Sequence, residues 1–486
     1  MTTKDSVARG GAAVGLARMV GMMLSFGLFL VLARHSAAEA GIFRTVVTYI
    51  IIAEFVGMLG LQRWLSTELA TAAAQRWPLF LATSAFSLGA SGALTVILLI
   101  VASSGVYEVA LSHALYIGAL GVLPSGVFAC VQAALIGIGQ NRALGRLNLI
   151  ENALRCSVAL GLVLIGESVA SLIWVFVVVR WGVTLYGFLA VRGTLNGRTW
   201  VLHRDLIGEA ARQAPRFAMI IIAFMLFRNA GMLLLPAISG ASETAVFAVA
   251  YQLFDLMLLV PSVLALTSNN LFASRADSSA TALRRAATQL LAVTAVALFP
   301  FAALAAVFAG NLLMFLYGSR YTGAQGALIE LMLTAALMMT DQVLSQVMVA
   351  SRNYQGDLIS ISSGASAAVV LTLLGTWWMG ATGAALALLL STFLTIAIRL
   401  RLLRRLFTVR LLLLSIWRPS LAALLTYALC ALALRSSLLA EVAHSRFTWL
   451  ACLPPMFALS ALLTYVLGGA SQSRRLRMKQ FLFHTR

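Results

Sequence analysis

Residues 78–103 read PLFLATSAFSLGASGALTVILLIVAS, a run without a single charged side chain. A helix needs about 20 mainly apolar residues to cross the hydrocarbon core of a bilayer. This stretch is long enough, so it predicts a transmembrane helix. The whole chain agrees, because 61% of its 486 residues are apolar and 10% are charged, whereas soluble domains are about 25% charged. The composition predicts a membrane protein.

Thirteen further stretches of similar length and character follow the same pattern. Together with the first they predict an all-α polytopic membrane protein with about fourteen transmembrane helices. The expected spans are 12–34, 41–62, 78–103, 110–137, 146–165, 169–191, 214–239, 244–270, 287–316, 326–350, 356–377, 381–402, 411–434 and 447–469.

Positive residues are distributed unevenly between the two sides that these spans define. The formal charge is +19, from 35 Lys and Arg against 16 Asp and Glu. The termini and the connections after even-numbered spans contain 26 of the 35 basic residues, the group around Arg399 included, whereas the alternate connections contain four. Such an excess marks the cytoplasmic side, so we expect both termini in the cytoplasm. We attribute the charge to contact with membrane lipids and expect no nucleic-acid partner.

The longest basic connection separates six spans from the next six. The sequence therefore predicts five parts: an N-terminal six-helix lobe (1–195), a basic cytoplasmic linker (196–213), a C-terminal six-helix lobe (214–404), helices 13 and 14 (405–470) and a basic tail (471–486). Features of one half recur in the other, since Gln132 and Gln346 precede equivalent connections. Two parallel repeats around a central cavity form an architecture typical of carriers.

Several motifs resemble one known family. They are Ala40-Gly41-Ile42-Phe43, Gly60-Leu61, Ala134-Leu135-Ile136-Gly137, Leu316-Tyr317-Gly318 with Tyr321, and Gly380-Ala381-Thr382-Gly383-Ala384-Ala385. The chain resembles the polysaccharide and oligosaccharide-lipid flippases of the multidrug/oligosaccharidyl-lipid/polysaccharide (MOP, MATE-like) exporter superfamily.

That resemblance implies a V-shaped bundle of two lobes in the inner membrane of a bacterium. It also implies a polyprenyl-diphosphate-linked oligosaccharide as substrate, destined for O-antigen, capsule or exopolysaccharide. A polysaccharide polymerase and a chain-length regulator are the protein partners that it implies.

We single out nine ionisable residues inside the predicted spans, where each costs about 2.5–3.5 kcal/mol on insertion scales. We expect the arginines to bind a substrate diphosphate, because a guanidinium group binds phosphate oxygens bidentately and stays charged. The acids are candidates for coupling ions or for ion pairs. The arginines are Arg18, Arg44, Arg228, Arg155 and Arg180, and the acids are Glu54, Asp255, Asp341 and Glu151.

These charges have a second interpretation, in which each arginine neutralises an acid and holds two helices together. Glu151 and Arg155 favour it locally, because residues four apart share one helix face. Prolines inside spans kink helices and are hinge candidates, although static packing explains them equally well. These prolines are Pro124, Pro236, Pro261 and Pro300.

We therefore expect a flippase that moves an undecaprenyl-diphosphate-linked oligosaccharide to the outer leaflet by alternating access. The alternatives are a cation-coupled multidrug exporter of the same superfamily and a membrane glycan polymerase or ligase. The first span contains Arg18 and no acid, which favours an anionic substrate. No phosphate-binding glycine loop or catalytic constellation occurs, so we expect no enzyme, no metal and no cofactor. Coupling to H⁺, to Na⁺ or to the membrane potential stays open.

Overall fold

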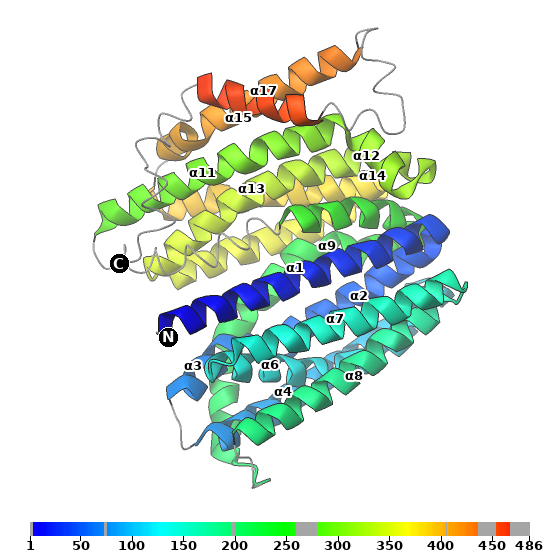
Figure 1. Ribbon diagram of the computed structural model, residues 1–486, viewed down its shortest axis with the longest axis vertical. Coiled ribbons are helices and arrows are strands. Elements are labelled where there is room, and N and C mark those ends of the chain that lie inside the picture. The colour runs from blue at the N-terminus through cyan, green and yellow to red at the C-terminus, as the bar shows by residue number, and fades with distance from the viewer. Residues whose placement is uncertain are drawn as a thin grey trace. The chain divides into compact units, whose positions relative to one another are not determined.

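The computed structural model describes residues 3–71, 75–195, 200–258, 279–404, 406–407, 409–435 and 453–466. Every regular element within these ranges is helical (Figure 1). Within the described residues, eleven helical segments are long and apolar enough to cross a membrane. They are Gly15–His35, Ala37–Gly57, Arg76–Ser103, Val109–Gly137, Asn141–Leu164, Val169–Thr194, Phe217–Met257, Ala280–Val307, Ser319–Ala350, Tyr354–Leu402 and Arg410–Cys430. The prediction of an all-helical, polytopic membrane protein is confirmed.

Two of these segments contain an abrupt break at a glycine. Helix α9 (Arg204–Met257) is interrupted at Gly240, and α14 (Tyr354–Leu402) at Gly380, both with positive φ. In α14 the chain reverses at the break, because the backbones of Gly375 and Gly383 lie in direct contact. A straight helix would separate these residues by about 12 Å. The α14 segment is therefore a helical hairpin, and its arms match the predicted spans 356–377 and 381–402.

Other predicted spans divide into shorter helices. The span 110–137 consists of α5 (Val109–Val122) and α6 (Ser125–Gly137), which meet at Pro124. The span 287–316 consists of α11 (Ala280–Val307) and α12 (Ala309–Tyr317). The last predicted span contains α17 (Leu453–Val466), which has 14 residues. The count of fourteen crossings stays a prediction.

The remaining helices of the first half are α1 (Thr3–His35), α2 (Ala37–Gly57), α4 (Arg76–Ser103), α7 (Asn141–Leu164) and α8 (Val169–Thr194). A ten-residue helix, α3 (Gln62–Thr71), lies in a connection for which we predicted no helix. Helix α3 packs closely against α6, because a Cβ on Gly137 of α6 would lie 2.6 Å from the carbonyl oxygen of Ser66 in α3. This packing explains the helix.

The chain divides into two compact units, Met1–Ala248 and Val249–Arg486. In unit 1, α1 lies along α7, α5 packs against α2, α4 and α8, and α6 packs against α3 and α4. An apolar core that includes Phe80, Phe128 and Leu135 fills one part of this unit. These contacts hold the polar residues of α2, α7 and α8 in fixed positions.

Unit 2 contains a second set of packed helices. Helix α13 (Gln325–Ala350) follows the 3₁₀ helix η2 (Ser319–Ala324) and packs against α14 and α11, and α11 packs against α15 (Val409–Arg435). Its core includes Leu290, Leu344 and Leu400. The sequence analysis divided the chain into five parts on the basis of a six-helix repeat, with boundaries at 195 and 214. That division stays a prediction.

Candidate functional site: two buried charge clusters

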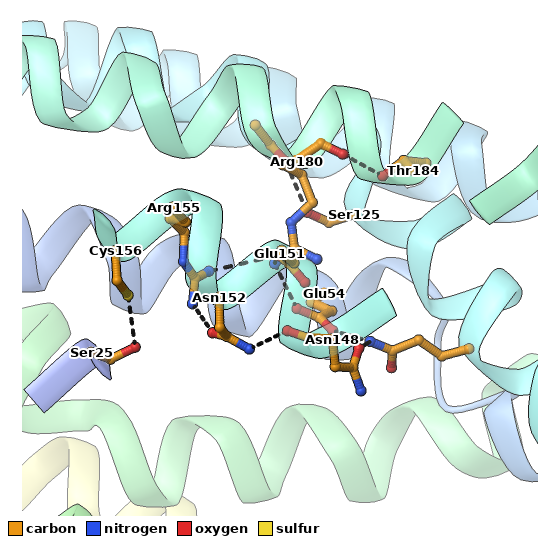
Figure 2. Close-up of polar contacts among 12 residues, drawn as sticks. Ser25, Glu54, Ser125, Asn148, Glu151, Asn152, Arg155, Cys156, Arg180 and Thr184 are labelled. Carbon is orange, nitrogen blue, oxygen red and sulfur yellow. Dashed lines mark hydrogen bonds and ion pairs between the residues drawn. The ribbon is translucent and has the colours of Figure 1, made fainter. Parts of the chain in front are cut away.

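Three helices of unit 1 bring four charged side chains together (Figure 2). Glu54 lies one turn before the end of α2, and the chain turns directly afterwards at Leu59 and Gly60, both with positive φ. Helix α7 supplies Glu151 and Arg155 from one face, and α8 supplies Arg180. We call these residues, with Gln132, Asn148 and Asn152, the N-cluster.

Arg180 is the centre of the N-cluster. Its Nη2 lies 3.0 Å from Glu54 Oε2 and 3.0 Å from Glu151 Oε1. Arg155 Nη1 lies 3.7 Å from the same oxygen of Glu151. Two carboxylates and two guanidinium groups make the formal charge of the cluster zero. The attraction between these opposite charges offsets part of the cost of removing the ions from water.

Amide side chains continue the network toward α6. Gln132 Nε2 donates to Glu54 Oε1 at 3.4 Å and to Asn148 Oδ1 at 3.3 Å. Arg155 Nη2 donates to Asn152 Oδ1 at 2.7 Å. Gln132 and Asn152 thus each contact a charged neighbour, and Asn148 accepts from Gln132.

Aromatic faces support both arginines. The Arg155 guanidinium lies 4.6 Å from the ring centre of Phe176, and that of Arg180 lies 4.5 Å from the ring centre of Phe128. Such cation–π contacts are worth about 0.5–2 kcal/mol, more when desolvated. They hold the guanidinium groups in place without using their N–H donors.

One edge of the N-cluster is accessible. The side chains of Glu54 and Arg155 are 20% and 17% exposed, whereas those of Arg180 and Glu151 are 5% and 6% exposed. Arg155 Nε and Arg180 Nη1 are buried and have no hydrogen-bond partner among the described residues. Buried donors without a partner are rare in proteins, so these two nitrogens require an explanation.

Helix α1 lies directly over α7 beside this cluster. A Cβ on Gly21 would lie 2.7 Å from Asn152 Nδ2, so only glycine allows this approach. One turn further, Ser25 Oγ and Cys156 Sγ are 3.7 Å apart. Arg18 lies one turn before Gly21, and the position of its side chain falls outside the described parts.

A second cluster lies in unit 2, and we call Asp341, Ser345, Asp357 and Arg399 the C-cluster. Arg399 Nη1 lies 3.0 Å from Asp341 Oδ2 and donates to the main-chain oxygen of Asp341 at 2.6 Å. Arg399 Nη2 lies 3.0 Å from Asp357 Oδ1, which also accepts from Ser345 Oγ at 2.9 Å. The cluster connects α13 with both arms of α14.

The sequence analysis counted Arg399 in a cytoplasmic basic group that contacts lipids, and the lipid contact is wrong for this residue, while its side of the membrane stays a prediction. Its side chain is 4% exposed and pairs with two acids. Asp357 was missed as well. Asp357 falls inside the predicted span 356–377 and Arg399 inside the span 381–402. These positions within spans could have indicated that the two residues are buried. The reason for the burial is the hairpin, which brings the start of one arm beside the end of the other.

The other proposed site residues lie elsewhere. Arg44 in α2 and Arg228 and Asp255 in α9 are half-buried, belong to neither cluster and make other contacts. Pro124 precedes α6, Pro236 lies inside α9 and Pro300 inside α11, while Pro261 lies outside the described residues. The hinge role of these prolines stays a prediction.

The described residues contain no group of three His, Cys, Asp or Glu arranged for a metal ion.

A further polar contact connects the loop between α4 and α5 with α9. Tyr107 Oη lies 2.8 Å from Tyr49 Oη and donates to the carbonyl oxygen of Leu233 at 3.1 Å. The next residue, Glu108, accepts from the backbone N–H of Ala241 at 3.3 Å. Burial raises the pKa of the Tyr107 phenol, and the hydrogen bond with Tyr49 opposes this in part.

Solved structures with the same fold define the class of protein. The lipid II flippase MurJ in an inward closed conformation aligns over 95% of this chain and 99% of its own, with 11% identity and a TM-score of 0.76. A MOP superfamily transporter from Pyrococcus furiosus aligns over 84% and 96%, with 15% identity and a TM-score of 0.61. An inward-facing multidrug resistance MATE transporter aligns over 79% and 94%, with 14% identity and a TM-score of 0.60. The chain has the fold of MOP superfamily transporters.

The family follows from the sequence itself. The model of the family described as "Polysaccharide biosynthesis protein" matches residues 31–325, and the chain belongs to this family. No curated protein matches the chain. The structural neighbours named above are flippases and transporters. They agree with the expectation that this chain is not an enzyme.

Proposed function

We propose that this multi-pass membrane protein flips an undecaprenyl-diphosphate-linked oligosaccharide from the cytoplasmic to the outer leaflet of a bacterial inner membrane. Both termini are cytoplasmic in this proposal, and the product enters surface polysaccharide assembly together with a polymerase and a chain-length regulator. The family membership and the similarity to the lipid II flippase MurJ support a lipid-linked saccharide as substrate.

The observation that carries the proposal is the accessible edge of the N-cluster. A diphosphate needs several N–H donors in a site that is only partly hydrated. The side chain of Arg155 is 17% exposed, and Asn152 and Phe176 hold its guanidinium group in place. Its buried Nε has no partner among the described residues. We assign Arg155 as a diphosphate ligand and Arg180 as the residue that positions Glu151 beside it.

Arg18, Arg44 and Arg228 remain proposed ligands. Arg18 lies on α1, three residues before the glycine that contacts Asn152. Arg18 therefore belongs to the part of α1 that packs beside the N-cluster. In the proposed cycle the two lobes open alternately to each side while the polyprenyl tail stays in the bilayer.

The membrane potential contributes a driving force in this cycle. Each charge that crosses an inside-negative membrane gains about 2.3 kcal/mol per 100 mV. A diphosphate that carries two negative charges outward therefore gains about twice this amount. Asp255, Asp341, Glu54 and Glu151 are the acids available for additional coupling to H⁺ or Na⁺.

A multidrug exporter of lipophilic cations is the alternative. Such an exporter needs surplus negative charge where the drug binds. The N-cluster has two acids and two arginines and therefore no surplus. Among the described residues, its unpartnered nitrogens, Arg155 Nε and Arg180 Nη1, are donors, which suit an anion. The oxygen of the cluster without a hydrogen bond, Glu151 Oε1, already lies 3.0 Å from Arg180 Nη2.

The test uses the purified full-length protein in proteoliposomes. Flipping of a fluorescent polyprenyl-diphosphate saccharide is measured by protection from a membrane-impermeant quencher, with a lipophilic cation as competing substrate. We expect flipping of the diphosphate lipid and no transport of the cation. Transport of the cation alone would overturn the proposal.

Arg155 is tested in the same assay. We expect Arg155→Ala to reduce flipping at least tenfold and Arg155→Lys to restore part of it. Arg142→Ala is the matched control, because Arg142 lies in the first turn of the same helix and is exposed. An Arg155→Ala protein that folds and flips at the wild-type rate would exclude Arg155 as a ligand.

A further inference from the structure

The two charge clusters differ in their balance. The N-cluster contains two carboxylates and two guanidinium groups. The C-cluster contains two carboxylates, Asp341 and Asp357, and the single guanidinium group of Arg399. If both acids were ionised, a net negative charge would remain in a site where all three side chains are about 90% buried or more. An uncompensated buried charge is costly, so the site requires one further positive charge.

The two carboxyl groups have unlike surroundings. Asp357 lies in the first turn of α14, where the positive end of the helix dipole favours an anion, and its Oδ1 accepts from Ser345 and lies beside Arg399. Asp341 lies in the middle of α13. Its Oδ2 meets Arg399, but its Oδ1 is buried and has no hydrogen-bond partner among the described residues. The ionised form is therefore better stabilised at Asp357 than at Asp341.

Among the residues that the structure describes, the other elements around α13 supply no second buried cation. Helix α11 faces this part of α13 with apolar side chains, among them Leu290 and Leu291. η2, which ends where α13 begins, is about 24 Å away along the helix axis. Arg352, in the connection between α13 and α14, and Tyr354 and Arg401 of α14 are exposed. The remaining charged or titratable groups of the packed elements and of α13 itself are Arg284 and Arg285 of α11, both exposed, Tyr317 of α12, Arg320 and Tyr321 of η2, and Glu330 of α13.

We propose that the C-cluster is a proton-binding site in which Asp341 holds one proton on Oδ1 while Asp357 is ionised. The proton removes the surplus charge and leaves Arg399 paired with one full carboxylate. When the proton leaves, two carboxylates compete for one guanidinium group. The contacts between α13 and the two arms of α14 then change.

A proton suits this site better than a metal cation. Hard cations bind shells of about six or more oxygen ligands. The described residues offer one unpartnered oxygen here, and its accessible surface is negligible. A proton needs neither a cavity nor a ligand shell.

The direct test is infrared difference spectroscopy of the purified full-length protein at neutral pH. A protonated carboxyl group gives a C=O band that shifts in deuterated water. We expect this band in the wild type and its loss in Asp341→Asn. We also expect its loss in Asp357→Asn, because Asp341 then ionises and pairs alone with Arg399. Glu151→Gln is the matched control from the balanced N-cluster and keeps the band.

Three results would overturn the proposal. They are a wild-type protein without the band, a band that persists in Asp341→Asn, and a band that disappears when Na⁺ replaces a large organic cation.

The thermal unfolding temperature provides a second measurement if one variant folds poorly. Asn mimics the protonated acid, so Asp341→Asn should unfold near the wild-type temperature, whereas Asp357→Asn should unfold at a lower one. Equal destabilisation of both would contradict the assignment of the proton.

The use of this proton in transport rests on the proposed function. In proteoliposomes, a pH gradient should change the flipping rate of the wild type at least severalfold and leave that of Asp341→Asn unchanged. A wild type that flips no lipid would defeat the proposed function, while the infrared result would still decide the proton site. A gradient response that survives in Asp341→Asn would remove the site from the transport cycle.

Discussion

Arg180 of α8 donates a 3.0 Å hydrogen bond to Glu54 of α2, a residue 126 positions earlier in the chain. The same nitrogen lies 3.0 Å from Glu151 of α7. One side chain therefore connects three helices of unit 1. It also places a cation between the carboxylates of Glu54 and Glu151.

The first prediction concerns this arginine. Removal of one partner from a buried ion pair costs about 3–5 kcal/mol, because the other charge remains uncompensated. We therefore expect Arg180→Ala to lower the thermal unfolding temperature in detergent and the insertion yield. The double variant Arg180→Ala with Glu151→Ala should recover part of the loss, since it restores the charge balance.

The control for this prediction is Arg142→Ala, which removes an exposed arginine from α7. It should unfold near the wild-type temperature. If the double variant were less stable than Arg180→Ala alone, the electrostatic explanation would be wrong.

The second prediction concerns the seam between α1 and α7. Because Ser25 Oγ and Cys156 Sγ are 3.7 Å apart, Ser25→Cys should form a disulfide with Cys156 under mild oxidation. Mass spectrometry of the digested protein identifies the linked peptides. Gly21→Val in the same background should reduce the yield, because a Cβ at this position meets Asn152.

Gly27→Val is the matched control on α1, since no heavy atom lies within 4 Å of a Cβ built there. It should leave the disulfide yield unchanged. Equal loss of cross-linking in both glycine variants would show that the effect is not the local contact with Asn152.

The third prediction concerns the hairpin in α14. The Cβ of Gly383→Ala would overlap the backbone of Gly375, so the two arms must separate. We expect a loss of stability of about 1–3 kcal/mol, typical of overpacking. Gly182→Ala in α8 has open space around the new methyl group and should be neutral or slightly stabilising. Thermal unfolding of both variants decides between these outcomes.

The fourth prediction concerns pH. Burial raises the pKa of Tyr107 above its ordinary value of about 10. The folded protein therefore holds the phenolic proton more tightly than the unfolded chain. This contribution to stability is complete below about pH 10 and is lost as the pH rises above it.

Thermal unfolding at about pH 9 and pH 11 measures this effect. Tyr107→Phe should show a smaller fall in stability between the two values than the wild type, because it cannot ionise. Tyr354→Phe removes an exposed phenol and should behave like the wild type. An unchanged pH response in Tyr107→Phe would mean that another group is responsible.

Hydropathy predicted most of the fold, because lipid imposes length and polarity on every spanning helix. The arms of α14 lie where the spans 356–377 and 381–402 were expected. Helix α3 was missed, since hydropathy identifies spans and α3 contains Arg63 and Glu68 within ten residues. Its helical form depends on packing against α6, which a search for periods and apolar runs does not detect.

The charged site was only partly predictable. The spacing of Glu151 and Arg155 placed them on one face, and they do share one cluster. The sequence could not assign Glu54 or Arg180 to them, because that contact depends on how α2 and α8 pack against α7. Arg399 was misread because a basic residue near the end of a span has the same signature whether it meets lipid headgroups or an acid in its own hairpin.

The position of Arg399 also affects biogenesis. Asp341 lies 58 positions before it, and Asp357 opens the hairpin that Arg399 closes. During synthesis both acids emerge from the ribosome before their cation does. Chains that stop short of Arg399 would leave an orphaned acid pair in the nascent helices, and membrane quality-control proteases could recognise this defect.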